Sequence, residues 1–140
     1  QDYPSALRLC ADGACQMVQA FPITGGDIPW SVYYSLGSSD ADQHARQAAF
    51  CRALAEAMGW IRARDPETYA AFLERTFPRL SVDVLVRVTR EYVAHGMWTS
   101  PRIDPVGYAR WQGGIAAGHL VCAPIAYDAL VDLVPTAAWA

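Results

Sequence analysis

The sequence lacks the features that mark several large classes of protein. No stretch approaches the ~18 consecutive apolar residues of a membrane-spanning helix, so we expect no membrane span. The basic residues are scattered and the formal net charge is -3, which argues against a nucleic-acid-binding surface. The chain starts at Gln1 without a basic-then-apolar leader. We therefore expect either that a leader has been removed or that these residues are a piece of a longer chain.

Motifs for catalysis and metal binding are missing as well. There is no Cys-x-x-Cys, no Cys/His cluster with zinc spacing and no Gly-x-Ser-x-Gly turn for a nucleophile. The three histidines, His44, His95 and His119, each stand alone, so we interpret them as ordinary helix residues. Cys51 lies in an expected helix beside Phe50 and is interpreted as a packing residue. The sequence therefore predicts no catalytic residue, no metal ligand, no cofactor and no enzymatic activity.

What is present indicates one folded domain with two kinds of secondary structure. Hydrophobic residues make up 53% of the chain and charged residues 18%, which is enough apolar material for a core. The N-terminal third has a β-like pattern and the remainder a helical one. We therefore predict an α+β fold weighted to α in a single domain, 1–140, with a hairpin and a strand in 1–37 and helices in 38–140.

The predicted hairpin spans Leu7 to Phe21 and turns at Asp12-Gly13, a dipeptide that suits a tight two-residue turn. In that register Cys10 and Cys15 face each other, with Cβ atoms about 4.5–5.5 Å apart. That spacing is close to disulfide reach. The pattern leaves two alternatives open, a disulfide in an oxidising compartment and two unpaired thiols.

A strand and four or five helices are predicted beyond the hairpin. Residues 28–36 are rich in β-branched and aromatic side chains and follow a break at Gly25-Gly26-Asp27, so we expect a strand there. Helices are expected to begin at capping residues, two of which precede a proline. The predicted caps are Ser39, Asp65, Ser81 and Asp104. Gly96 and Gly118 are expected to end the last two of these helices, and a short fifth helix is expected over 125–133.

The aromatic residues beside the Gly-Gly break are the candidates for ligand binding. Trp30 and Tyr33 lie on the predicted strand, where a ring can stand at the mouth of a cleft and hold a flat or polar ligand. The alternative is that both rings belong to the core. The Gly25-Gly26-Asp27 segment is too short for a phosphate-binding loop, so a plain turn is the preferred interpretation. The predicted ligand-binding residues are Gly25, Gly26, Asp27, Trp30 and Tyr33.

Several short motifs occur in an order that resembles one family of proteins. The motifs lie in residues 26–34, 50–54, 58–61, 65–70, 77–81, 96–98, 103–108, 118–120 and 127–132. Gln112 belongs to the same series and lies between 103–108 and 118–120. In this order they resemble the C-terminal half of the ABC-transporter solute-binding proteins of the nitrate, sulfonate, taurine and thiamine-pyrimidine-precursor type. The resemblance covers about Met17 to Asp132, and no single motif in it is diagnostic.

The resemblance implies a fold, a function and a location. Family members are two-lobed α/β proteins of the periplasmic binding protein-like kind, and 28–36 would be a strand that crosses between the lobes. The implied function is the substrate-binding component of an ABC importer for a small organic or oxyanion solute, with a permease partner and a periplasmic or extracytoplasmic location. The alternatives are a relative of the thiamine-pyrimidine-precursor synthases and a free-standing helical interaction module. As half of such a fold, the isolated chain is expected to self-associate.

Overall fold

The computed structural model describes residues 2–20, 24–36 and 40–139. It divides into two compact units, each built from two stretches of chain. Unit 1 comprises Gln1–Gly25 and Met58–Thr99, and unit 2 comprises Gly26–Ala57 and Ser100–Ala140. These divisions differ from the boundary at residue 37 expected from the sequence, and the interpretation of 1–140 as a single domain stays a prediction.

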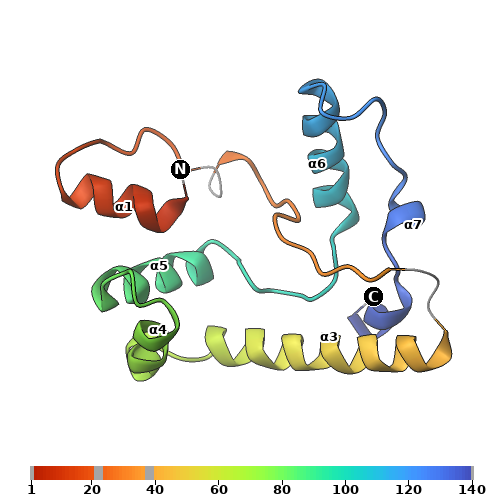
Figure 1. Ribbon diagram of the computed structural model, residues 1–140, viewed down its shortest axis with the longest axis horizontal. Coiled ribbons are helices and arrows are strands. Elements are labelled where there is room, and N and C mark those ends of the chain that lie inside the picture. Colours follow the sequence, from red (N-terminus) through yellow and green to blue (C-terminus); the bar gives the residue numbers. More distant parts are fainter. Residues whose placement is uncertain (1, 21–23, 37–39, 140) are drawn as a thin grey trace. The chain divides into compact units, whose positions relative to one another are not determined.

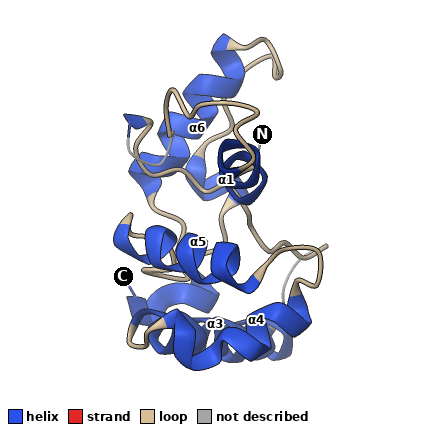
Figure 2. Ribbon diagram, turned by 90° about the vertical axis from the view of Figure 1, so that its left-hand side faces the viewer, coloured by secondary structure: helices blue, strands red, loops and turns tan. Residues whose placement is uncertain are grey.

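Helices are the regular elements of the described residues, and no strand is present among them (Figures 1 and 2). The α-helices are α1 (Tyr3–Ala11), α3 (Ala41–Arg62), α4 (Ala70–Thr76), α5 (Val82–Ala94), α6 (Pro105–Ala117) and α7 (Tyr127–Leu130). Two 3₁₀ helices, η1 (Pro66–Tyr69) and η2 (Val134–Trp139), complete the set. The expected α+β fold, with a hairpin and a strand crossing between two lobes, is therefore wrong.

The predicted hairpin is replaced by helix α1. Its start carries the same signal that the sequence uses at later helices, an aspartate followed closely by a proline. The Asp2 carboxylate accepts a hydrogen bond from the Ser5 amide at 3.0 Å, and Pro4 occupies the first turn. Leu7, which was assigned to a strand, is buried as part of the helix. The pattern of apolar residues over this short segment fits either structure, and the cap decides for the helix.

Asp12-Gly13 ends α1 and does not turn a hairpin. Gly13 has a φ of +71°, in the left-handed region that glycine adopts at low cost. The Gly13 amide donates to the Cys10 carbonyl at 3.1 Å, and the Ala14 amide donates to the Leu9 carbonyl at 3.0 Å. This is the Schellman arrangement of a helix C-terminus. Both a type I′ turn and a helix C-cap favour Asp-Gly, so the dipeptide alone does not distinguish a hairpin turn from a helix end.

The segment 28–36 is irregular, with a bend at Ser31, and pairs with no strand in the described part of the chain. Its β-branched and aromatic residues fit a pleated surface, but a strand also needs a neighbour for its backbone amides and carbonyls. The strand prediction is therefore wrong, because side-chain composition indicates extended chain and does not supply the partner.

The predicted helix starts are mostly correct. Asp65 accepts from the Glu67 amide at 2.9 Å, and Asp104 accepts from the Gly107 amide at 2.6 Å. Ser81 caps α5 as predicted. The Asp65-Pro66 start opens the short η1 before α4 begins. Ser39, the predicted cap of α3, lies outside the described residues; the Asp40 side chain accepts from the Gln43 amide at 2.7 Å.

The core of unit 1 forms where α5 packs against α4, η1 and α1 (Figure 1). Leu85 on α5 is buried with Tyr69 of η1 and Leu73 of α4. Val86, Val88 and Thr89 are buried on the same helix, which follows from their spacing along one face. On its exposed side Arg90 donates to Asp65 and Glu67, both at 2.8 Å, and so ties α5 to the start of η1.

Many large apolar side chains remain exposed. They concentrate in the extended segments, where Val18 is 97% exposed, Tyr34 86% and Leu36 87%. α3, the longest helix, has no buried residue among its described side chains. None of the helices in the described part of the chain has the length and apolar character needed to cross a bilayer.

Candidate binding site

The candidate site lies in unit 2, where the Gly26-Asp27 segment reaches helix α6. Gly107, in the first turn of α6, is buried, and a Cβ atom placed on it would lie 2.9 Å from the Asp27 carbonyl oxygen. Only glycine allows the segment to approach the helix this closely. Gly26 and Asp27 therefore lie beside the side chains of the next turn of α6.

Arg110 is the charged group at this point. Its guanidinium donates a hydrogen bond from Nη1 to the Asp27 carbonyl oxygen. Gly26 lies against the same group, since a Cβ atom there would be 2.9 Å from the guanidinium carbon. Gly26 also has a φ of +70°, so a side chain would be strained as well as crowded. In the described residues the remaining N–H donors of Arg110 have no hydrogen-bond acceptor, and the side chain is exposed.

Two aromatic contacts continue the site along the extended segment. Trp30 meets Trp111 of α6 edge-on, with ring centroids 5.8 Å apart and planes at 70°. Tyr33 meets Phe50 of α3 edge-on, with centroids 4.8 Å apart. Edge-to-face pairs of this kind are favourable beyond the area that they bury. Trp30 and Tyr33 still keep 78% and 75% of their surface exposed, so neither ring is a core residue.

Helix α6 is held in place by hydrogen bonds between buried or half-buried side chains and backbone atoms. The Tyr108 hydroxyl donates to the Ile125 carbonyl at 2.9 Å, and the Ile125 amide donates to the Gln112 side-chain oxygen at 3.0 Å. The Tyr127 hydroxyl donates to the Ile103 carbonyl at 2.6 Å, and its ring packs edge-on against Tyr108. These bonds join the start and the middle of α6 to the segment around α7 and so fix the position of Arg110.

The structure brings together some of the predicted ligand residues and separates others. Gly26, Asp27 and Trp30 meet at α6, as described above. Tyr33 packs on α3 and shares no ring contact with Trp30 in the described structure. Gly25 is exposed at the end of unit 1's first stretch. The sequence-based prediction missed Arg110 as a site residue, although its position directly after the Tyr108 motif offered a signal.

The three histidines lie apart from the Arg110 contacts in the described structure. His44 lies 2.9 Å from Asp132, with both side chains partly exposed, which ties the start of α3 to the residues after α7. His95 caps α5, and Gly118 caps α6 as expected, followed by His119 with a φ of +55°. In the described residues no group of three or more His, Cys, Asp and Glu side chains is close enough to hold a metal ion.

Comparison of the chain with family models, with curated proteins and with solved structures gives no match.

The arrangement is suited to binding. An exposed guanidinium with several donors recognises carboxylate, sulfonate or other oxyanion groups in a planar, bidentate manner. The neighbouring Trp30 and Trp111 rings offer a surface for the apolar or flat part of a ligand. The site thus combines the Arg110 cation with the rings of Trp30 and Trp111. Arg110 and Trp111 belong to α6, which the hydrogen bonds of Tyr108, Gln112 and Tyr127 hold in position.

Proposed function

We propose that the chain binds a small organic or oxyanion solute at the Arg110 site, as the substrate-binding component of an ABC importer. The proposal includes a permease partner and an extracytoplasmic location. It concerns the binding role and does not include the two-lobed α/β fold, which the absence of strands from the described residues rules out. The chain is proposed to be a binding protein and not an enzyme.

One observation carries the proposal: of the residues selected from sequence as ligand-binding, Gly26 and Asp27 lie against the Arg110 guanidinium of α6, and Trp30 packs on the neighbouring Trp111 ring. The order of the motifs gives independent support. Several motif residues, Asp104, Gly107, Tyr108, Gln112 and Tyr127, act together in unit 2 as caps, close approaches and hydrogen-bond partners. The motifs that produce the resemblance are therefore the ones that position Arg110.

Titration calorimetry with nitrate, with taurine and with a neutral pyrimidine tests the proposal. We expect one of the three solutes to bind, and Arg110→Ala to weaken binding of an anionic one by about 10- to 100-fold, because a hydrogen bond to a charged group contributes about 1.5–3 kcal/mol. Arg110→Lys should recover only part of this loss, since an ammonium group lacks the bidentate fork.

Arg52→Ala is the matched control, because Arg52 is an exposed arginine on α3 in the same unit. It should leave the affinity unchanged. The proposal fails if none of the solutes binds, or if Arg52→Ala weakens binding as much as Arg110→Ala does.

A further inference from the structure

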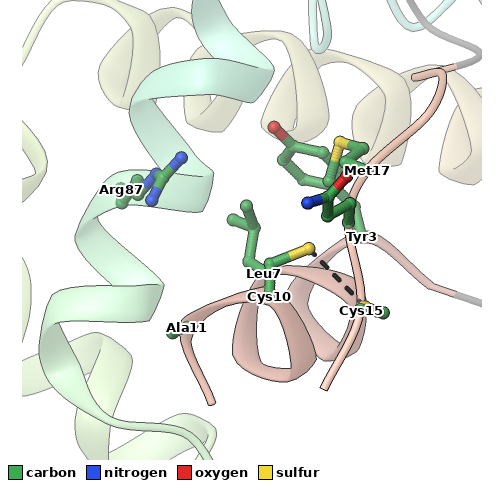
Figure 3. Close-up of a pocket in the computed structure, with 8 residues that line it drawn as sticks. Tyr3, Leu7, Cys10, Ala11, Cys15, Met17 and Arg87 are labelled. Carbon is green, nitrogen blue, oxygen red and sulfur yellow. Dashed lines mark hydrogen bonds between the residues drawn. The ribbon is translucent and has the colours of Figure 1, made fainter. Parts of the chain in front are cut away.

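Three sulfur-containing side chains, Cys10, Cys15 and Met17, line one hollow at the end of α1 in unit 1. The sulfurs of Cys10 and Cys15 lie 3.6 Å apart, close enough for one thiol to donate a weak hydrogen bond to the other. Met17 lines the same hollow of about 430 Å³. Figure 3 shows Cys10 and Met17 on the same side of α1, with Leu7 beside them. Two thiols and a thioether within eight residues form a cluster that the binding site in unit 2 does not use.

The backbone holds this cluster in place. The left-handed Gly13 and the two hydrogen bonds of the helix C-cap reverse the chain after α1 and return Cys15 to the side of Cys10. Leu7 is buried one turn earlier on α1, which fixes the helix against α5. The separation of the sulfurs is therefore set by the cap and by packing, and not by a covalent bond between them.

The geometry fits a metal ion bound by both sulfurs. With bonds of about 2.3 Å, as at zinc thiolates, two sulfurs on one ion lie about 3.8–4.0 Å apart for angles between tetrahedral and trigonal. The observed 3.6 Å needs only a small movement to reach this range. Cys15 is exposed and Cys10 half-buried, so an ion can enter from solvent.

The donor atoms select the kind of ion. Thiolate and thioether are soft ligands that favour Cu(I), whereas zinc sites take four ligands from Cys, His and carboxylates. The other side chains around the hollow are Tyr3, Leu7, Ala11, Gln16 and Arg87, none of which is a histidine or a carboxylate. Arg87, on α5, supplies a positive charge at the hollow, although it also pairs with Glu91 at 2.9 Å.

We propose that Cys10, Cys15 and Met17 form a Cu(I) site in unit 1. Each thiol releases its proton to solvent as its sulfur bonds to the ion, while the Met17 thioether binds as a neutral ligand. The ion keeps its oxidation state, so no oxidant or reductant is consumed. Bound Cu(I) and two thiolates carry one net negative charge, which Arg87 partly offsets. The site is independent of the solute-binding function proposed for unit 2.

Competition for Cu(I) against a chromophoric chelator, under anaerobic conditions with ascorbate, tests the site on the full chain. We expect one Cu(I) per chain. Loss of a supporting group in the outer shell of a metal site lowers the affinity by about 10- to 100-fold. Cys10→Ser and Cys15→Ser each remove a direct ligand, so each should lower the Cu(I) affinity by more than that. Met17→Leu should lower it by a smaller factor, and circular dichroism should show that all three variants keep their helices.

Cys51→Ser and Cys122→Ser are the matched controls, because they remove the other two thiols of the chain. Neither should change the Cu(I) affinity. The proposal is overturned if Cys10→Ser and Cys15→Ser bind Cu(I) as well as the unaltered chain, if the controls weaken binding equally, or if one ion bridges two chains. Binding of Zn(II) as tight as that of Cu(I) would also overturn it, and an unchanged Met17→Leu would remove Met17 from the site.

Discussion

The two units of this protein are stabilised in different ways. Unit 1 has a small apolar core between short helices, with Leu85, Tyr69 and Leu73 buried together, and ion pairs on its surface. Unit 2 has few buried apolar side chains among its described residues and depends on hydrogen bonds between backbone atoms and the side chains of Tyr108, Gln112 and Tyr127. Apolar packing tolerates changes in surface chemistry, whereas a hydrogen-bonded arrangement positions specific atoms. The candidate binding site lies in the second kind of unit.

The largest effect is expected in the core of unit 1. Leu85→Ala should lower the free energy of unfolding by about 2–5 kcal/mol, because it removes a buried side chain and leaves a cavity beside Tyr69 and Leu73. Urea denaturation followed by circular dichroism measures the change. Leu120→Ala in unit 2, where the side chain is 76% exposed, should change it by no more than about 0.5 kcal/mol. Equal losses from the two substitutions would refute the assignment of the core to α5.

A smaller effect is expected from the hydrogen bonds of unit 2. Gln112→Leu keeps the volume of the buried side chain but leaves the Ile125 amide without its acceptor, which should cost about 1–3 kcal/mol. The same denaturation experiment measures it, with Gln43→Leu on α3 as the control, since Gln43 is only half-buried. If Gln112→Leu stabilises the chain, unit 2 is held by apolar packing after all and the contrast between the units disappears.

The smallest effect concerns Tyr3, whose hydroxyl donates to the Glu91 carboxylate and links α1 to α5. This hydrogen bond, together with burial and the charge of Glu91, raises the pKa of Tyr3 from 10.0 to about 12. A pKa raised by folding gives stability that is present below pH 10 and lost as the pH rises towards 12. Burial alone would raise the pKa of Glu91, but the hydrogen bonds from Tyr3 and Arg87 outweigh it and lower the pKa.

Tyr3→Phe should therefore cost about 1 kcal/mol at neutral pH, and the difference from the unaltered chain should vanish between pH 10 and 12. Thermal unfolding across this pH range measures the difference, and Tyr34→Phe, at an exposed tyrosine of unit 2, is the control. A difference that stays constant up to pH 12 would show that the Tyr3–Glu91 bond does not form.

The sequence predicted the helices better than the extended parts. Asp65, Ser81 and Asp104 were identified as caps because a capping side chain, followed by a proline at Asp65 and Asp104, is a local signal that needs no tertiary partner. The same signal at Asp2 and Pro4 was overlooked in favour of the Asp12-Gly13 turn. The strand over 28–36 was wrong for another reason, since pairing depends on a second segment that composition does not reveal.

The candidate site was predicted only in part. Gly26, Asp27 and Trp30 were selected because glycines and aromatics after a chain break often border a ligand site, and they do meet in the structure. Arg110 was not selected, because its position directly after the Tyr108 motif does not reveal which segment its side chain meets. Its role follows from the approach of the Gly26-Asp27 segment to Gly107, which joins residues about eighty positions apart and appears only in three dimensions.

Amide hydrogen exchange resolved by residue tests the contrast between the units most directly. The account predicts slow exchange for the amides of α5, which are covered by the core of unit 1, and fast exchange along 28–36, where the described structure provides no backbone partner. Fast exchange along 28–36 would mean that Trp30 and Tyr33 are held by their ring–ring contacts and not by backbone pairing. Alternating protected amides along 28–36, the pattern of a paired strand, would contradict the account, as would exchange in α5 as fast as in the extended segment.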